Sequence, residues 1–196
     1  MLHSRVVDEF YIGIDEVGRG PWAGPLVSVA AYGRDRDVPT RVTDSKSLSQ
    51  KVRDDLHQEI VKSVRLSIGW TLPAELDELG LSAATSQAME LAVLNLNQVA
   101  PIYLDGNVDY LPNHNVELVP KGDLSVPLIG AASIVAKQLR DRYMQHIDSC
   151  YPEFGFGAHV GYGTKQHKVA LEKYGPSQQH RRSFKPVQRL ISEAEL

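Results

Sequence analysis

Apolar residues fall into short runs along the chain, and these runs predict the strands of a sheet. The runs at 10–18 and 25–33 predict two strands joined by a short link, which favours an antiparallel pair. Residues 64–72 alternate between apolar and other side chains, which predicts a half-buried third strand. Two shorter apolar runs, at 101–105 and 116–120, predict a fourth and a fifth strand.

Between and after these runs, apolar side chains recur at helical spacing. The pattern predicts a short helical turn at 73–80 and helices at 49–62, 81–99, 128–149, 164–174 and 186–195. In the second of these helices, Met89, Val93, Leu96 and Ala100 are spaced by four, three and four residues, so we expect them in the core. The order of elements predicts an α/β fold, a mixed five-stranded sheet flanked by helices, formed as a single domain over residues 1–196.

Composition excludes several classes of protein. The chain has 196 residues, 42% of them hydrophobic and 23% charged, which is ordinary for one globular domain. No apolar run reaches the roughly 18 residues that a membrane span needs, and the N-terminus lacks an apolar signal segment. Cys150 is the only cysteine, so an internal disulfide is impossible and a thiol zinc site is disfavoured. We expect a cytoplasmic protein that acts as a monomer.

Positive charge is concentrated near the C-terminus. Residues 164–189 hold seven Lys or Arg and one acid, so this segment carries +6 in a chain whose net charge is −3. The basic residues are Lys165, Lys168, Lys173, Arg181, Arg182, Lys185 and Arg189. A basic face beside an acidic body suits a polyanionic partner, but a solvated basic helix and loop would give the same pattern.

Three predicted strands end in a carboxylate close to a glycine. The first ends at Asp15 and Glu16, the fourth at Asp105, and Asp123 follows the fifth. Ligands of α/β sheets bind at such strand ends, so neighbouring strands would gather four carboxylates. Each close like-charged pair costs about 4 kcal/mol at an effective dielectric constant near 20, so the cluster requires cations. Hard oxygen ligands favour Mg²⁺ or Mn²⁺, and a pair of such ions is used for displacement at phosphorus.

The first pair of acids presents a difficulty. Consecutive residues of a regular strand point to opposite faces, so Asp15 and Glu16 should not share a site. Either the strand bends before Glu16, or Glu16 reaches the metals by another route. Asp15 is the more certain ligand of the two.

A glycine-punctuated turn follows these acids. Gly18, Arg19 and Gly20 are too few for a phosphate-binding loop and do not form a dinucleotide fingerprint. Small residues with free backbone groups beside a metal site could instead contact a sugar hydroxyl. The ribose 2′-hydroxyl is the group that distinguishes RNA from DNA at a site.

Together with several later motifs, these residues resemble the ribonuclease HII family, the type 2 ribonucleases H, in its bacterial form. The motifs are GIDEVGRGPWAGP at 13–25, DSK at 44–46, LDGN at 104–107, KGD at 121–123, AASIVAK at 131–137, RDR at 140–142, GYGT at 161–164 and HRRSF at 180–184. The resemblance runs from about residue 11 to 187, with the motifs in the family's order. It implies a ribonuclease H-like fold with additional C-terminal helices, residues 150–196 forming a substrate-binding extension.

The resemblance also implies an activity and a set of site residues. It implies hydrolysis of the RNA strand of RNA/DNA hybrids and nicking 5′ of single ribonucleotides in duplex DNA, leaving a 5′-phosphate and a 3′-hydroxyl. By motif, the metal-binding catalytic residues are Asp15, Glu16, Asp105 and Asp123, with two ions, Mg²⁺ or Mn²⁺, per site. The substrate-binding residues are Gly18, Arg19 and Gly20 at the 2′-hydroxyl, Tyr162 stacking on the next deoxyribose, and Lys46 at a phosphate.

Some positions keep a plainer interpretation. Without the resemblance, Tyr162 is an ordinary half-buried tyrosine and Lys46 a solvated lysine. Val160 stands where the family often has a lysine, which puts one phosphate contact in doubt. His159, His167 and His180 lack a metal-ligand spacing, so we interpret them as polar surface residues or as supports of the site. Two rival functions remain, another nuclease of the same fold, such as a junction resolvase, and a non-catalytic nucleic-acid-binding module.

Overall fold

The computed structural model describes residues 9–42 and 48–194 and contains the mixed sheet that the sequence predicts. The strands are β1 (Tyr11–Val17), β2 (Leu26–Gly33), β3 (Arg65–Thr71), β4 (Ile102–Asp105) and β5 (Val116–Val119), in the spatial order β3-β2-β1-β4-β5. Strands β1, β2 and β3 pair antiparallel, whereas β4 and β5 run parallel to β1. The α/β prediction with five strands is therefore confirmed.

The helices also follow the predicted order. They are α1 (Gln50–Ser63), α2 (Pro73–Leu79), α3 (Leu81–Leu96), α4 (Pro127–Asp148), α5 (Phe156–His159), α6 (Lys165–Tyr174) and α7 (Lys185–Ala194), with short 3-10 turns η1 (Asp35–Asp37) and η2 (Gly122–Leu124). The sequence pattern did not predict α5, η1 or η2. Each is three or four residues long, which is too short to form a periodic apolar stripe.

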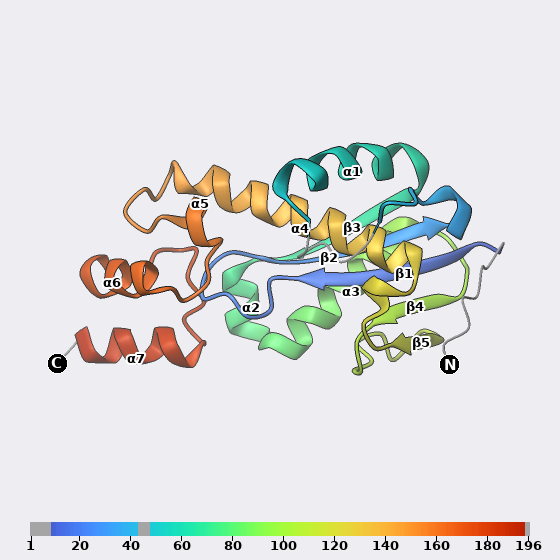
Figure 1. Cartoon of the computed structure of the whole chain (residues 1–196). Coiled ribbons are helices and arrows are strands. Elements are labelled where there is room, and N and C mark those ends of the chain that lie inside the picture. Colours follow the sequence, from blue (N-terminus) through green and yellow to red (C-terminus); the bar gives the residue numbers. More distant parts are fainter. Residues whose placement is uncertain (1–8, 43–47, 195–196) are drawn as a thin grey trace.

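Helices cover both faces of the sheet, with α1 and α4 on one face and α3 on the other (Figure 1). On the first face, Leu56 and Ile60 of α1 are buried, and Val52 packs against them. On the second face, Met89 and Val93 of α3 are buried, as the helical spacing predicts. The two faces therefore enclose two separate layers of apolar side chains.

In strand β3 the small residues are more buried than the large apolar residues, which is the opposite of what its apolar pattern predicts. Ser67, Gly69 and Thr71 are buried, whereas the larger residues between them are only half-buried. A Cβ on Gly69 would lie 1.8 Å from the carbonyl oxygen of Ala88, so the backbone of α3 lies directly on this strand. Small side chains are needed where a helix approaches so closely. The larger residues point to the other face, where Leu66 and Ile68 join the cluster that contains Leu56 and Ile60 of α1, and the Trp70 ring lies 5.8 Å from that of Tyr143 on α4.

Helix α4 connects the sheet to the C-terminal helices. The helix packs closely on β1 because Gly13 has no side chain, since a Cβ there would lie 2.5 Å from the backbone nitrogen of Ile129. Its second half joins a separate apolar cluster with Phe154, Phe156 and Val187. The arrowhead of β1 points toward α5, α6 and α7 (Figure 1), so the predicted site at the strand end faces these helices. Within the described residues, no helix is both long and apolar enough to cross a membrane.

Candidate active site

The strand register brings two of the predicted acids to the same edge of the sheet. Strands β1 and β4 are parallel, and Ile14 lies opposite Leu104, so Asp15 and Asp105 follow side by side. Asp123 lies in η2, directly after the neighbouring parallel strand β5. The backbone N–H of Gly122 donates to Asp105 Oδ1 at 2.7 Å and ties η2 to the end of β4.

A cavity of about 150 Å³ opens at this edge. It is lined by Asp15, Glu16, Val17, Asp105, Asp123, Ser133 and Lys137. All four predicted carboxylates thus border one space, although they come from three separate segments of the chain. Their roles as metal ligands stay a prediction.

Burial and mutual repulsion dominate the electrostatics of Asp15, whose side chain is almost fully enclosed. Its Oδ1 accepts the backbone N–H of Glu16 at 2.7 Å, and its carboxyl also bonds the hydroxyl of Ser133. Burial, and then the nearby charges of Glu16 and Asp105, raise the pKa of Asp15 well above its ordinary value, although the bond from Ser133 acts in the opposite direction. The site is therefore costly to charge without a compensating cation.

Glu16 reaches the cavity from the other face of β1. The strand continues past both acids without a bend, and Asp15 faces Ser133 of α4. The Glu16 carboxylate instead lies 3.5 Å from Arg19 Nη1, and the Arg19 guanidinium lies 4.9 Å from the ring centre of Tyr110 in the core on the α3 side. Because β1 stays paired with β2 through Glu16 and Val17, the strand is regular at both acids, which favours the second alternative: Glu16 lies on the face opposite Asp15 and still lines the same cavity. Burial raises the pKa of Glu16, and the charge of Arg19 opposes this rise.

The donor set fits a divalent cation of the Mg²⁺ type. The cavity offers four carboxylates from different directions, and its lining holds a single cation among the described side chains, Lys137, whose Nζ bonds Asp141 Oδ1 at 2.6 Å. Within the described residues, no three His, Cys, Asp or Glu side chains are already gathered closely enough to enclose an ion. Oxygen donors of this kind suit a hard ion, which would also reduce the repulsion between the carboxylates.

Sequence reasoning missed two residues of this cavity, Ser133 and Lys137. They stand one helical turn apart on α4 and therefore face the same direction. The sequence showed this spacing within the predicted helix, but the small residues there indicated only close packing. A search for polar residues four apart on that helix would have found both.

Beside the acids, the two predicted loop glycines have different roles. Gly18 has a φ of +96°, and a Cβ there would lie 2.5 Å from Arg140 Nε and 2.6 Å from the carbonyl oxygen of Pro25. Gly18 is therefore required by the fold itself. A Cβ on Gly20 would meet only the ring of Tyr162, at 3.7 Å, which is an ordinary contact. Gly20 thus keeps open the space beside Tyr162, a side chain that is 47% exposed.

The buried guanidinium groups of Arg181 and Arg140 donate hydrogen bonds to backbone carbonyls of this loop. Arg181 donates from Nε and Nη2 to the Gly24 carbonyl at 2.9 and 2.8 Å, and from Nη1 to the Arg19 carbonyl at 3.2 Å. Arg140 donates to the carbonyls of Pro25 at 2.9 Å and Ala23 at 3.0 Å. Burial lowers the pKa of Arg181 to about 9 and that of Arg140 to about 10.

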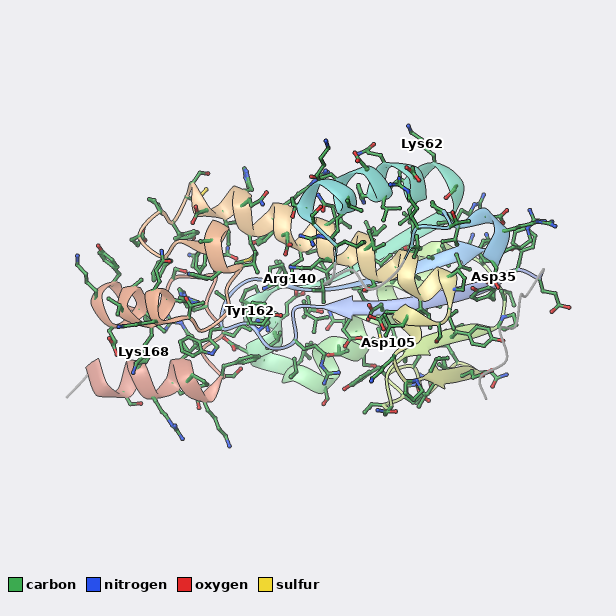
Figure 2. The ribbon with its side chains drawn as sticks, in the orientation of Figure 1. Asp35, Lys62, Asp105, Arg140, Tyr162 and Lys168 are labelled. Carbon is green, nitrogen blue, oxygen red and sulfur yellow. The ribbon has the colours of Figure 1, made fainter. Side chains whose placement is uncertain are left out.

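The interpretation of Arg181 as part of a basic surface is therefore wrong, because its side chain is fully buried. A guanidinium has five N–H donors, and here the carbonyls of Gly24 and Arg19, far away along the chain, accept three hydrogen bonds from it. The other basic residues of the segment are exposed, and Lys168 lies on α6 at the end of the molecule away from Asp105 (Figure 2). They are Lys165, Lys168, Lys173, Arg182, Lys185 and Arg189.

The remaining predicted residues have mixed outcomes. Lys46 lies outside the described residues. Val160 has a φ of +44°, which is unfavourable for a β-branched residue, and its carbonyl accepts Arg140 Nη1 at 2.9 Å. His159, His167 and His180 are buried, so their interpretation as surface residues is wrong. They contact the ring of Phe156 in α5 and the backbone carbonyls of Phe154 and Tyr162, which lie just before and after this helix.

Comparison with known proteins finds related sequences and structures over most of the chain. Residues 12–187 match the family model described as Ribonuclease HII. The chain is 45% identical over 183 residues to ribonuclease HII of Shewanella loihica, covering 91% of this chain and 88% of that protein. It is 44% identical over 187 residues to ribonuclease HII of Aliivibrio fischeri, covering 93% and 89%. The crystal structure of ribonuclease H2 from Pyrococcus horikoshii OT3 superposes with a TM-score of 0.81 at 27% identity, covering 95% of this chain and 99% of that one.

Proposed function

The chain belongs to the ribonuclease HII family, metal-dependent endonucleases that act on the RNA strand of RNA/DNA hybrids, and from that premise we propose a finer activity for it. The protein nicks duplex DNA on the 5′ side of single embedded ribonucleotides. It leaves a 5′-phosphate and a 3′-hydroxyl. Two divalent ions, Mg²⁺ or Mn²⁺, are bound by Asp15, Glu16, Asp105 and Asp123.

The carboxylates position the reaction at the strand ends. Asp15 and Asp105 stand next to each other on parallel strands, and the Gly122 N–H bond at 2.7 Å fixes the orientation of Asp105. Ions bound there would polarise a water and neutralise the charge that develops on the departing 3′ oxygen. The protein side chains themselves need no covalent intermediate, since in-line attack by water suffices.

The neighbouring loop selects a ribonucleotide over a deoxyribonucleotide. Gly20 keeps a space open beside the exposed ring of Tyr162, and Arg181 fixes the Arg19 carbonyl from below. Backbone groups at Gly18, Arg19 and Gly20 would contact the 2′-hydroxyl of a ribose bound there. The Tyr162 ring would then stack on the next deoxyribose. These contacts extend along the substrate strand away from the acids.

The C-terminal helices supply the affinity for the duplex. Residues 150–196 form the substrate-binding extension, in which six exposed Lys and Arg side chains on and around α6 and α7 contact phosphates. Such contacts are independent of sequence and weaken steeply with salt. We further propose that the protein acts as a monomer in the cytoplasm.

The observation that carries this proposal is the meeting of four carboxylates at one cavity, at the end of the sheet that faces α6 (Figure 1) and Tyr162 (Figure 2). The test is a cleavage assay on three substrates, a DNA duplex with one ribonucleotide, the same duplex entirely of DNA, and a four-way DNA junction. We expect a single nick 5′ of the ribonucleotide and no product from the other two. Cleavage of the junction would favour a resolvase, and binding to all three with no product would favour a pure binding module.

A further inference from the structure

The three histidines that the catalytic site does not use form one buried group behind Tyr162. His159 is the last residue of α5, His167 lies in the first turn of α6, and His180 lies in the segment before α7. Their side chains are 8%, 0% and 2% exposed. The rings of His159 and His167 are stacked with their centres 4.5 Å apart.

Their hydrogen bonds determine where each proton sits. The backbone N–H of Ser177 donates to His180 Nδ1 at 3.0 Å, so that nitrogen is an acceptor and the proton is on Nε2. His180 Nε2 lies 2.9 Å from His167 Nε2, which must then be the acceptor of this pair. The proton of His167 is consequently on Nδ1, which donates to the Tyr162 carbonyl at 2.9 Å.

His159 is ordered in the same way from the other side. The backbone N–H of Gly161 donates to His159 Nδ1 at 3.2 Å, which leaves the proton on Nε2 to donate to the Phe154 carbonyl at 2.9 Å. The backbone N–H of Tyr162 also donates to the carbonyl of His159, at 2.9 Å. Each of the three rings therefore has one nitrogen that accepts a hydrogen bond, and a further proton on that nitrogen would place two donors face to face.

The hydrogen bonds of these histidines end at the backbone of Gly161 and Tyr162, the segment that carries the Tyr162 ring. His167 bonds the carbonyl of Tyr162, and His159 bonds the backbone N–H of the residue before it, Gly161. The Gly161 carbonyl in turn accepts the backbone N–H of Trp22 at 2.8 Å, which links the segment to the loop after β1. The exposed ring of Tyr162 lies beside Gly20, which belongs to the same loop after β1 as Trp22.

We propose that His159, His167 and His180 are positioning residues, an uncharged chain with ordered protons that holds the backbone of Gly161 and Tyr162 and so aims the Tyr162 ring at the substrate. The inference rests on the proposed role of Tyr162 as a substrate contact. Neutral rings fit this role, because burial lowers the pKa of His167 to about 4 and that of His180 to about 3. His167 and His180 therefore stay uncharged near neutral pH.

The first test uses two variants of one residue. His167→Asn keeps an amide N–H where Nδ1 stands and can still donate to the Tyr162 carbonyl, whereas His167→Gln keeps only the contact with His180. We would measure affinity for a fluorescent DNA duplex with one ribonucleotide by anisotropy in EDTA, where no cleavage occurs. Loss of one net hydrogen bond predicts about two- to tenfold weaker binding for His167→Gln and less than about twofold change for His167→Asn.

Combination with Tyr162→Ala separates positioning from general destabilisation. If His167 acts through Tyr162, His167→Gln has no further effect on affinity in the Tyr162→Ala background. Equal losses for the Asn and Gln variants, or an undiminished loss in that background, would overturn the histidine role. Unchanged affinity of Tyr162→Ala alone would instead reject the proposed function of Tyr162.

A spectroscopic measurement tests the chain independently of substrate. Long-range ¹H–¹⁵N spectra of the intact protein at pH 7.5 distinguish a proton on Nδ1 from one on Nε2. The expected result is Nδ1–H for His167 and Nε2–H for His159 and His180. A different tautomer at His167, or a charged ring at this pH, would contradict the proposed arrangement.

Discussion

Replacing Asp105 by asparagine should separate the stability of the active site from its activity. Asp105 lines the acidic cavity, and its Oδ1 accepts the Gly122 N–H at 2.7 Å. An asparagine oxygen can accept the same bond, so the variant keeps the local geometry. It removes one negative charge from the group of four carboxylates, and with it one proposed metal ligand.

The size of the effect follows from Coulomb's law. Two carboxylates about 5 Å apart repel by about 3 kcal/mol at an effective dielectric constant of 20. Because Asp105 is only half-buried, solvent screens part of this repulsion, and we expect a gain of about 1–3 kcal/mol in the free energy of unfolding in EDTA. For a chain of this length, this gain raises the melting temperature by roughly 2–10 °C. Cleavage should fall by at least about a thousandfold, because ions can no longer be held in the productive arrangement.

Two assays on the same preparation check this prediction. Thermal melts in EDTA and in Mg²⁺ measure stability, and cleavage of a duplex with one ribonucleotide measures activity. The metal should stabilise the parent protein and have little effect on Asp105→Asn. Asp109→Asn is the matched control, because Asp109 is exposed, accepts the Leu111 N–H at 2.8 Å and does not line the cavity. Cleavage by Asp105→Asn at the parent rate, or equal stabilisation of it by Mg²⁺, would refute the metal-ligand role.

Three further predictions concern the loop and its supports. Gly20→Ala should lose less than about 1 kcal/mol in the free energy of unfolding, but it should bind the ribonucleotide duplex more weakly, because its methyl group enters the space beside the Tyr162 ring. Gly18→Ala should also lower the melting temperature. Arg181→Met should lower the free energy of unfolding, measured in urea, by about 2–5 kcal/mol, because the carbonyls of Gly24 and Arg19 lose their donors. The control is Arg182→Met at the exposed neighbouring residue, which should lower it by less than about 0.5 kcal/mol. Equal losses in the two variants would contradict the role of Arg181 as a buried support. Burial holds the pKa of His167 near 4, below its ordinary value of 6.5, so the unfolded chain binds more protons between these values. Stability should therefore fall by about 3 kcal/mol as the pH drops from 6.5 to 4, and His167→Asn, measured by urea titration at both values, should lack this part of the decline.

The sequence predicts most of the sheet because the period of a strand or a long helix is a local property. Strand β1 and helix α3 follow their apolar patterns, and the acids at strand ends converge because parallel neighbours end at the same edge. The face of β3 that lies under α3 could not be predicted in this way. Gly69 sits beneath the backbone of Ala88, and only the tertiary packing determines that the small residues, rather than the large ones, are buried there.

The buried polar residues are a second limit of sequence reasoning. Arg181 and His167 are of types that usually lie at the surface, so a pattern of polar residues predicts exposure. Their burial depends on partners far along the chain, such as the Gly24 carbonyl, 157 residues from Arg181. Such partners become visible only when the fold is known. The 3.5 Å contact of Glu16 with Arg19 was likewise not visible in the pattern of polar residues.

The most direct test of the account is a crystal structure of the protein soaked in Mn²⁺, with the ions located by anomalous scattering. The account predicts two Mn²⁺ peaks in the cavity at the end of β1, contacted by oxygens of Asp15, Glu16, Asp105 and Asp123. It also predicts that Asp105→Asn crystals lose at least one of these peaks. A cavity without Mn²⁺, or ions bound only elsewhere on the surface, would contradict the claim that these carboxylates form a single metal site.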